Sequence, residues 1–334
     1  MAMNMIPPAG APAFLAEAGW GEAQILPLAG DASFRRYFRI VDGARRSILM
    51  DAPPPHEDPR PFISVGEWLC DHGFAAPTIL ARDLDQGLVL LEDFGDERVR
   101  EHLDAAPSEE MAIYARAVDL LVDLHRVPAQ AGLAPYDRAV YQREAGLLTE
   151  WFAPAAGLDV DSQAYAAAWD KVLPIAERDA APVVTVLRDY HAENIMLLQD
   201  LSRSQGLGLL DFQDALAGHP AYDLVSLLQD ARRDVSPAVE RAMLAHYQAN
   251  APVSGDFEAA YAVLGAQRNA KIIGIFTRLW KRDGKPRYLD FLPRMWGLLE
   301  RDLAHPALAP VADWFAANVP TDARGQLMSD QDIA

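Results

Sequence analysis

The segment Leu187–Leu198, LRDYHAENIMLL, constrains the fold more than any other part of the sequence. It places a short polar loop between two apolar runs that have the length and composition of buried strands. The loop carries Asp189 and, five residues later, Asn194. A further apolar run downstream ends in Asp211. Two carboxylates and an amide are therefore expected at strand ends and loops, where side chains can serve one site.

An acid, an amide and a second acid in this arrangement are typical of phosphoryl transfer. One carboxylate, here Asp189, can orient an acceptor hydroxyl and take its proton, while Asn194 and Asp211 can hold Mg²⁺. Oxygen ligands suit Mg²⁺ better than zinc or copper. Asp and Asn are also common loop residues, and their spacing alone arises by chance. The strand context and the Asp211-Phe212 pair favour the catalytic interpretation.

Charge and cysteine content exclude several classes of protein. The 334 residues include 30 Lys and Arg against 48 Asp and Glu, a net charge of −18, which argues against nucleic-acid binding. Cys70 is the only cysteine, so no intrachain disulfide and no cysteine zinc site is expected. The first twenty residues lack the basic start of a signal peptide, and no apolar run approaches 18 residues. We expect a cytoplasmic protein that neither spans nor binds a membrane.

The hydrophobic pattern predicts an α+β chain with two lobes. Alternating and apolar runs bounded by turns predict strands at 26–28, 33–40, 47–50, 78–83 and 88–93, with a helix at 60–72, and short strands at 183–187, 195–198 and 207–212. Helical spacing predicts helices at 109–126, 137–152, 162–178, 222–232, 237–250, 257–282, 288–303 and 309–317. We therefore expect a strand-rich lobe at 1–94, a mostly helical lobe at 95–320 and a flexible tail at 321–334.

Asp189, Asn194 and the Asp211-Phe212-Gln213 run together resemble the catalytic loop and metal motif of the aminoglycoside phosphotransferase and choline kinase family. That family's loop usually reads H-G-D-x-x-x-x-N, whereas Leu187-Arg188 stands here in place of His-Gly. Downstream, GHPAYDLVSLL resembles the family's helix start, with Asp223 at its buried acid. The resemblance implies a bilobal protein-kinase-like fold, with a small antiparallel-sheet lobe and a larger helical lobe, that uses ATP and Mg²⁺.

Several longer segments narrow the resemblance. The sequence is similar in five segments to the anomeric N-acetylmuramate/N-acetylglucosamine kinases of bacterial peptidoglycan recycling. These segments are GDASFRRYFRI, MDAPP, LRDYHAEN, LLDFQDALAGHPAYDLVSLLQDAR and RNAKIIGIFTRLWKRDGKPRYL. That similarity implies transfer of phosphate from ATP to the C1 hydroxyl of an amino sugar, with the product passed to a sugar-1-phosphate nucleotidyltransferase. The alternatives are another small-molecule kinase of this fold, acting on aminoglycosides, choline or homoserine, and a nucleotide-binding pseudokinase.

The nucleotide side departs from a protein kinase, which carries a lysine on its third strand. The run Ser47–Asp51 has no lysine there, so another cation must meet the phosphates. Arg36 is our favoured residue, and Gly30 and Ser33 are expected to wrap the triphosphate, although solvated strand residues would look the same. Without that lysine, the role of Glu67 as a paired helix carboxylate is open. Glu92 and Phe94 are expected at the hinge, where backbone groups would read adenine.

The acceptor side is suggested by a cationic stretch. Residues 271–294 hold seven Lys and Arg against two Asp, which favours an anionic ligand such as the lactyl carboxylate of N-acetylmuramate and disfavours cationic aminoglycosides. Arg278, Trp280 and Asp214 are the predicted sugar-binding residues, and a solvated helix face is the alternative. His191 is expected to orient the loop and Asp223 to hold its backbone. The sequence leaves open which of the two sugars is preferred.

Overall fold

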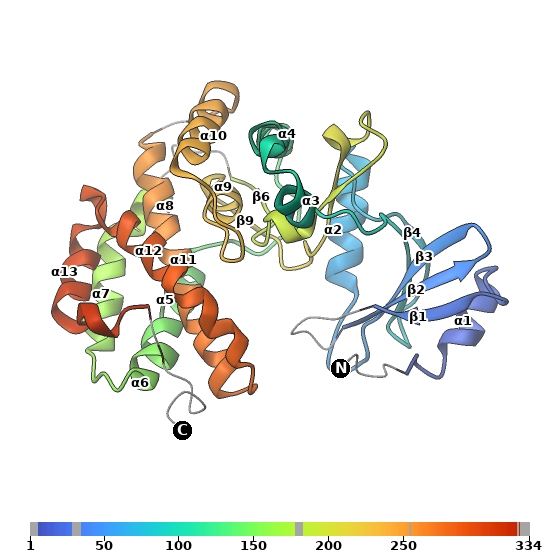
Figure 1. Cartoon of the computed structure of the whole chain (residues 1–334), viewed down its shortest axis with the longest axis horizontal. Helices are drawn as coiled ribbons and strands as arrows, with labels where there is room; N and C mark the ends of the chain where they lie inside the picture. The colour runs from blue at the N-terminus through green and yellow to red at the C-terminus, as the bar shows by residue number, and fades with distance from the viewer. Residues whose placement is uncertain (1–5, 29–34, 178–182, 254, 326, 328–334) are drawn as a thin grey trace. The chain divides into compact units, whose positions relative to one another are not determined.

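The computed structural model describes residues 6–28, 35–177, 183–253, 255–325 and 327, coloured along the chain in Figure 1. The chain forms two compact units: Met1–Ala117 with Glu193–Ala215, and Val118–Ala192 with Leu216–Ala334. They are called unit 1 and unit 2 below. The predicted lobe boundary at residues 94 and 95 stays a prediction, because compactness alone does not define a functional lobe. None of the helices among the described residues is long and apolar enough to cross a membrane.

Unit 1 is built on an antiparallel five-stranded sheet with the order β1-β2-β3-β5-β4. Its strands are β1 (Gln24–Pro27), β2 (Arg36–Asp42), β3 (Arg45–Asp51), β4 (Ile79–Asp83) and β5 (Leu88–Glu92), and its helices are α1 (Ala11–Glu17), α2 (Arg60–Asp71), α3 (Val99–Ala105), η1 (Pro107–Glu109) and the first half of α4 (Glu110–Leu124). The predicted strands and the inserted helix are therefore present, and Asp42-Gly43 makes the predicted turn, with φ of 58° at Gly43.

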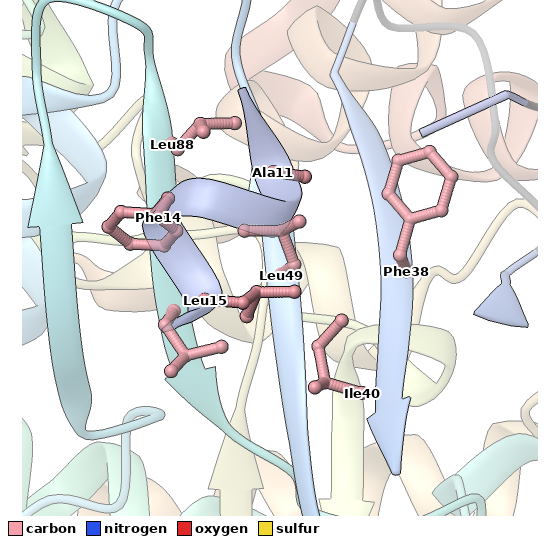
Figure 2. Packing of buried hydrophobic residues seen from close by; sticks show 8 residues of the cluster. Ala11, Phe14, Leu15, Phe38, Ile40, Leu49 and Leu88 are labelled. Carbon is pink, nitrogen blue, oxygen red and sulfur yellow. The ribbon is translucent and has the colours of Figure 1, made fainter. Parts of the chain in front are cut away.

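The short helix α1 covers one face of this sheet. Its Phe14 and Leu15 pack with Ile40, Leu49 and other inward-facing strand residues (Figure 2). These residues alternate along β2 and β3, so one face of the sheet is apolar and needs a cover. The sequence analysis predicted the strands but neither α1 nor α3, since a seven-residue helix offers too few turns for a clear period.

The second segment of unit 1 forms a small hairpin of β7 (Ile195–Leu197) and β8 (Leu207–Leu209), joined through η4 (Ser204–Gly206). The amide of Leu209 donates to the carbonyl of Ala75 at 2.7 Å. The ring of Phe212 stacks on Phe62 of α2, with centroids 4.8 Å apart. Gly66 leaves room for this ring, because a Cβ there would lie 3.3 Å from it. The hairpin and Phe212 thus fix Asp211 within unit 1.

Unit 2 is mostly helical, which with the sheet of unit 1 confirms the predicted α+β class. Its elements are the second half of α4, α5 (Arg138–Ala145), the π-helical turn η2 (Leu148–Phe152), α6 (Ala153–Ala155), α7 (Ser162–Val172), α8 (Pro174–Glu177), β6 (Val184–Val186), β9 (Leu216–Gly218), α9 (Ala221–Leu228), α10 (Pro237–Asn250), α11 (Phe257–Lys281), η5 (Pro286–Phe291), α12 (Leu292–Leu303), η6 (Pro306–Leu308), α13 (Ala309–Asn318) and η7 (Thr321–Ala323). A short turn, η3 (Ala192–Asn194), carries the chain from unit 2 into unit 1. Strands β6 and β9 pair antiparallel, and the Asp189 loop begins where β6 ends.

Helix α11 is the central element of unit 2. It packs against α12, α9, α5, η2 and η5, and most of its 25 residues are buried. Gly274 sits at the closest approach, because a Cβ built there would lie 2.4 Å from the carbonyl carbon of Leu147. A helix buried on nearly all sides is expected to be apolar, so the Arg, Lys, Gln and Asn side chains that α11 carries call for polar partners.

Three predicted helices are interrupted. The helix predicted at 137–152 ends at Ala145 and continues as the π-helical turn η2. The helix predicted at 162–178 divides at Pro174, which cannot donate a helical hydrogen bond. The helix predicted at 288–303 starts as 3₁₀ turns and becomes α-helical at Leu292. Strand β9 was not predicted, because its Leu-Ala-Gly sequence contains no β-branched or aromatic residue.

The close approach at Gly274 yields a stability prediction. Gly274→Ala should lower the free energy of unfolding by about 1–3 kcal/mol, because the new methyl overlaps the Leu147 backbone. Gly297→Ala in α12 is the matched control, since nothing lies within 4 Å of its Cβ position, and it should gain about 0.5–1 kcal/mol. Denaturant unfolding of both variants measures this, and equal effects would contradict the packing.

Candidate active site

The loop that carries Asp189 is held by the buried side chain of Asp223, in the first turn of α9. The amide of Leu187 donates to Asp223 Oδ2 at 2.7 Å, and the amide of Arg188 donates to Oδ1 at 2.8 Å. Burial raises the pKa of Asp223 to about 7, although both amide donors act in the opposite direction. Asp223 thus fixes the backbone immediately before Asp189.

Arg188 adopts a left-handed backbone, with φ of 71°. This region favours glycine, the residue that the resembled family usually has at this place, so an arginine needs compensating contacts. Its guanidinium forms an ion pair with Glu144 and lies over the ring of Tyr136, 5.5 Å from the centroid. These contacts offset the local strain and direct the side chain into unit 2.

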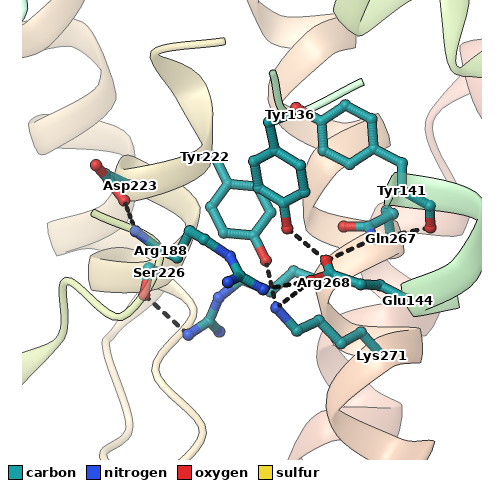
Figure 3. Close-up of polar contacts among 10 residues, drawn as sticks. All are labelled: Tyr136, Tyr141, Glu144, Arg188, Tyr222, Asp223, Ser226, Gln267, Arg268 and Lys271. Carbon is teal, nitrogen blue, oxygen red and sulfur yellow. Dashed lines mark hydrogen bonds and ion pairs between the residues drawn. The ribbon is translucent and has the colours of Figure 1, made fainter. Parts of the chain in front are cut away.

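Glu144 is the centre of a polar network inside unit 2 (Figure 3). Lys271 Nζ of α11 lies 3.2 Å from Glu144 Oε1, and the hydroxyl of Tyr136 donates to Oε2 at 2.5 Å. Lys271 also donates to the hydroxyl of Tyr222 at 3.3 Å. Burial raises the pKa of Glu144, but Lys271 and Arg188 outweigh it and the net pKa is lowered. The carboxylate is therefore ionised and holds two cations beside the catalytic-loop segment.

Asp189 is half-buried, and its charge is set by the same surroundings. Burial raises the pKa of Asp189, but Lys271, His191 and Arg268 lower it further than burial raises it. The net pKa lies below the ordinary aspartate value, so Asp189 is ionised at neutral pH. An ionised carboxylate can accept a hydrogen bond from a hydroxyl and take its proton as a bond to oxygen forms.

His191 is buried behind the same loop. Burial lowers its pKa to about 4, so the ring is neutral at physiological pH. Arg232 Nη1 lies 3.4 Å from His191 Nε2, and the amide of Ala192 donates to Asp230 Oδ2 at 3.3 Å. These contacts anchor the middle of the loop on the segment after α9, which is compatible with the predicted orienting role of His191.

The other two predicted catalytic-motif residues lie together in unit 1. Asn194 Nδ2 donates to Asp211 Oδ2 over 3.4 Å, and Gln213 Nε2 donates to Asp211 Oδ1 at 2.9 Å. Asp211 is exposed and has a left-handed φ of 57°. The side chains of Asn194 and Asp211 lie side by side and both carry oxygen atoms, a donor set that suits Mg²⁺. This ion usually takes few protein ligands and completes its shell with water and phosphate oxygens. The described residues contain no cluster of three or more His, Cys, Asp or Glu that would suit another metal.

The arginine beside Asp211 is Arg35, whereas the sequence led us to favour Arg36. Arg35 Nη2 lies 3.8 Å from Asp211 Oδ1, and its Nε lies 3.7 Å from Glu57. Arg36 faces the opposite way on β2, where its Nε donates to the buried Asp51 at 2.7 Å. The structure therefore brings Arg35, and not Arg36, to the predicted metal residues. Phosphate binding by Arg36 stays a prediction.

The remaining nucleotide-side predictions fall in three places. Gly30 and Ser33 lie outside the described residues. Glu92 ends β5, accepts from Thr78 Oγ1 at 2.8 Å and forms an ion pair with Arg203. Phe94 follows on the next segment, and its ring lies so close to Gly208 that a Cβ there would be 2.7 Å away. Glu67 of α2, whose role was open, pairs with Arg82 at 2.9 Å.

The predicted sugar-binding residues are not all brought together. Asp214 is exposed in unit 1. Arg278 lies seven residues after Lys271 on α11, which puts both on one face of the helix. Trp280, two residues later, faces away from that side and has Lys281 Nζ 3.6 Å from its ring centroid. The sugar-binding roles of all three stay predictions.

Comparison with known proteins assigns the family. Residues 24–263 match the phosphotransferase enzyme family, which is well over half of the chain. The chain belongs to the phosphotransferase enzyme family. The family assignment agrees with the ionised Asp189 and the paired Asn194 and Asp211, because each supplies a group that phosphoryl transfer needs.

Curated relatives are similar along nearly the whole length of this phosphotransferase. An N-acetylmuramate/N-acetylglucosamine kinase of Caulobacter vibrioides is 37% identical, and the match covers 93% of this chain and 96% of the relative. A protein of the same name from Pseudomonas aeruginosa is 39% identical, covering 91% and 92%.

Solved structures of the same fold include choline kinase LicA from Streptococcus pneumoniae, with a TM-score of 0.59 and 14% identity over 86% of this chain and 93% of that one. A streptomycin–ATP complex of an aminoglycoside phosphotransferase has a TM-score of 0.58 and 14% identity, covering 91% and 98%. At this identity the likeness shows the fold alone, and it confirms the kinase-like class predicted from the sequence.

The sequence did not single out Glu144 or Lys271 as residues around the site, and among Arg35, Arg36 and Arg39 it favoured Arg36. Glu144 and Lys271 sit on helices far apart in the chain, so no local spacing connects them. One signal was available, because a glutamate and a lysine on otherwise buried helix faces imply a partner for each. The contacts separate Arg35 from its neighbour, because Arg35 lies beside Asp211 whereas Arg36 pairs with Asp51.

The buried Asp223 gives a pH-dependent stability prediction. Its folded pKa is about 7 against an ordinary value of 3.8, so the native state keeps a proton that the unfolded state releases. Stability should therefore fall as pH rises from about 4 to about 7, by on the order of a few kcal/mol. Asp223→Asn removes this titration, so the stability gap between wild type and variant should shrink from pH 5 to pH 7.5.

Urea unfolding at the two pH values measures that gap. Asp313→Asn, at an exposed position of α13, controls for the loss of one carboxylate and should leave a small gap that does not change with pH. A gap for Asp223→Asn that stays constant would show that Asp223 is ionised throughout.

Proposed function

We propose that this phosphotransferase uses ATP and Mg²⁺ to phosphorylate the anomeric C1 hydroxyl of N-acetylmuramate, N-acetylglucosamine or both. The observation that carries the proposal is the 34–39% identity to kinases named for these two sugars, which extends over most of the chain. The cationic residues that follow Lys271 support an acceptor with an anionic group.

In this mechanism Asp189 orients the C1 hydroxyl and accepts its proton as the oxygen attacks the γ-phosphate. The low pKa of Asp189 keeps it ionised, so it is ready to accept a hydrogen bond. An anomeric hydroxyl is more acidic than other sugar hydroxyls, and a carboxylate of low basicity suffices for it. Asp223 accepts hydrogen bonds from the backbone just before Asp189, and the Glu144 network lies beside it, so both hold Asp189 in place. Phosphoryl transfer depends on such positioning.

On the nucleotide side, Asn194 and Asp211 would hold Mg²⁺, which when bound neutralises phosphate charge. We assign the phosphate-binding cation to Arg35, because it lies beside Asp211, whereas Arg36 is engaged by Asp51. Release of Arg35 from Asp211 and Glu57 would free its guanidinium for phosphate oxygens. The segment from Glu92 to Phe94 is proposed to offer backbone groups to adenine.

The proposed product, a sugar 1-phosphate, indicates which class of enzyme uses it next. A sugar 1-phosphate retains an activated anomeric position, which suits it to a sugar-1-phosphate nucleotidyltransferase that condenses it with a nucleoside triphosphate. We infer that such an enzyme consumes the product in peptidoglycan recycling. The use of ATP as phosphate donor supports a cytoplasmic location for the reaction.

A panel of acceptors tests the proposal. The wild-type enzyme with ATP and Mg²⁺ should phosphorylate N-acetylmuramate or N-acetylglucosamine, and ³¹P NMR should show an acid-labile sugar 1-phosphate. Choline and kanamycin, run alongside, should give no turnover above the no-acceptor rate. Turnover of choline or kanamycin alone would overturn the substrate assignment and leave the phosphotransferase family intact.

Asp189→Asn should reduce kcat by at least about 10³-fold, because the amide cannot take the hydroxyl proton. ATP binding, measured by calorimetry with Mg²⁺, should stay within about threefold of wild type, since Asp189 does not serve the nucleotide in this mechanism. The control is Asp211→Asn, which should impair Mg²⁺-dependent ATP binding itself. A variant at Asp189 that keeps most turnover would exclude it as the base.

A further inference from the structure

Helix α11 leaves one stripe of its surface half-exposed. Lys271, Ile275 and Arg278 are partly accessible, while nearly all residues between them are buried. Their spacing of four and three residues puts them on one side of the helix. The stripe begins at Lys271, whose charge acts on Asp189, so it leads away from the predicted catalytic base along α11.

A second segment runs beside this stripe. Lys271 Nζ lies 3.2 Å from Glu144 Oε1. Figure 3 draws this ion pair. Three residues further along both segments, Gly274 packs directly against Leu147. The two segments therefore run in the same direction at this contact. Four residues beyond Gly274 comes Arg278, and four residues beyond Leu147 comes Trp151 in the π-helical turn η2. An α-helix and a π-helical turn each complete one turn in about four residues. Arg278 is therefore on the same side of its helix as Gly274, and Trp151 is on the same side of its segment as Leu147.

Both of these residues bury a hydrogen-bond donor that has no partner. Arg278 Nε and Trp151 Nε1 are buried and lack a hydrogen-bond acceptor among the residues that the structure describes. Arg278 also forms no ion pair with any of them, whereas Arg294 pairs with Asp234 and Arg301 with Glu240. A buried donor without an acceptor lowers stability, so such groups usually serve a ligand or a water molecule.

We propose that Arg278 and Trp151 bind the lactyl carboxylate of N-acetylmuramate and thereby favour this sugar over N-acetylglucosamine. The inference rests on the proposed function, and the two sugars differ by this one substituent. A guanidinium and an indole N–H are both donors, and a carboxylate is the acceptor that gains most from the positive charge. Arg278 lies two helical turns, about 10 Å, beyond Lys271. This spacing separates the carboxylate site from the C1 hydroxyl at Asp189.

The test compares kcat/KM for the two sugars in each variant. Arg278→Gln keeps an N–H donor but loses the charge, and it should lower the ratio of kcat/KM for N-acetylmuramate to that for N-acetylglucosamine by roughly 10- to 100-fold. Trp151→Phe keeps the ring and loses only the Nε1 donor, and the ratio should fall by roughly 3- to 10-fold. Arg282→Gln, at the exposed end of α11 where Arg282 pairs with Asp283, is the matched control and should leave the ratio unchanged.

Each outcome separates this inference from the proposed function. A ratio that stays constant in both variants, even if both kcat/KM values fall, would overturn the carboxylate assignment and indicate a group that the two sugars share, such as the acetamide. Wild-type turnover of N-acetylglucosamine alone would overturn it while sustaining a sugar kinase. Turnover of neither sugar would overturn the proposed function itself. Thermal unfolding of each variant identifies a loss that comes from misfolding, and Trp151→Phe then decides alone.

Discussion

The two hydrogen bonds from the amides of Leu187 and Arg188 to Asp223 are the interaction on which the geometry of the Asp189 loop depends. These two amides stand immediately before Asp189, where the chain leaves β6 and turns through a left-handed residue. Without an acceptor they would be buried donors at a strained position. One carboxylate at the start of α9 satisfies both, so the direction of the loop is fixed by a helix that follows it by more than thirty residues.

Electrostatics around this loop follow from the composition of α11. A helix that is buried on most sides nevertheless carries Arg268 and Lys271, and both lower the pKa of Asp189. Glu144 on the neighbouring helix forms ion pairs with Lys271 and Arg188 and holds both cations in place. Both cations still lower the pKa of Asp189. Unit 1 has a smaller version of the same arrangement, in which Arg35 lies between Glu57 and Asp211. In each unit a predicted functional carboxylate thus has a cation beside it.

Local pattern accounts for what the sequence predicted well. Alternation along β2 and β4 and the 3.6-residue period of α10 appear within a few residues of the structural bounds, because burial of one face imposes these periods directly on the chain. The predictions failed where local pattern is short or mixed, as in α1, β9 and the π-helical turn η2. Packing of Gly274 against Leu147 accompanies that turn, and no nearby residue signals it.

The sequence by itself determined the family and predicted the chemistry, because Asp189, Asn194 and Asp211 stand in short contiguous segments and their residue types suit phosphoryl transfer. Only the tertiary structure decided the surroundings that tune this chemistry. Glu144 meets Lys271 across two helices separated by more than a hundred residues, and Arg35 rather than Arg36 lies beside Asp211. Coulomb energy depends on distance in space, and distance between remote segments is set by packing alone.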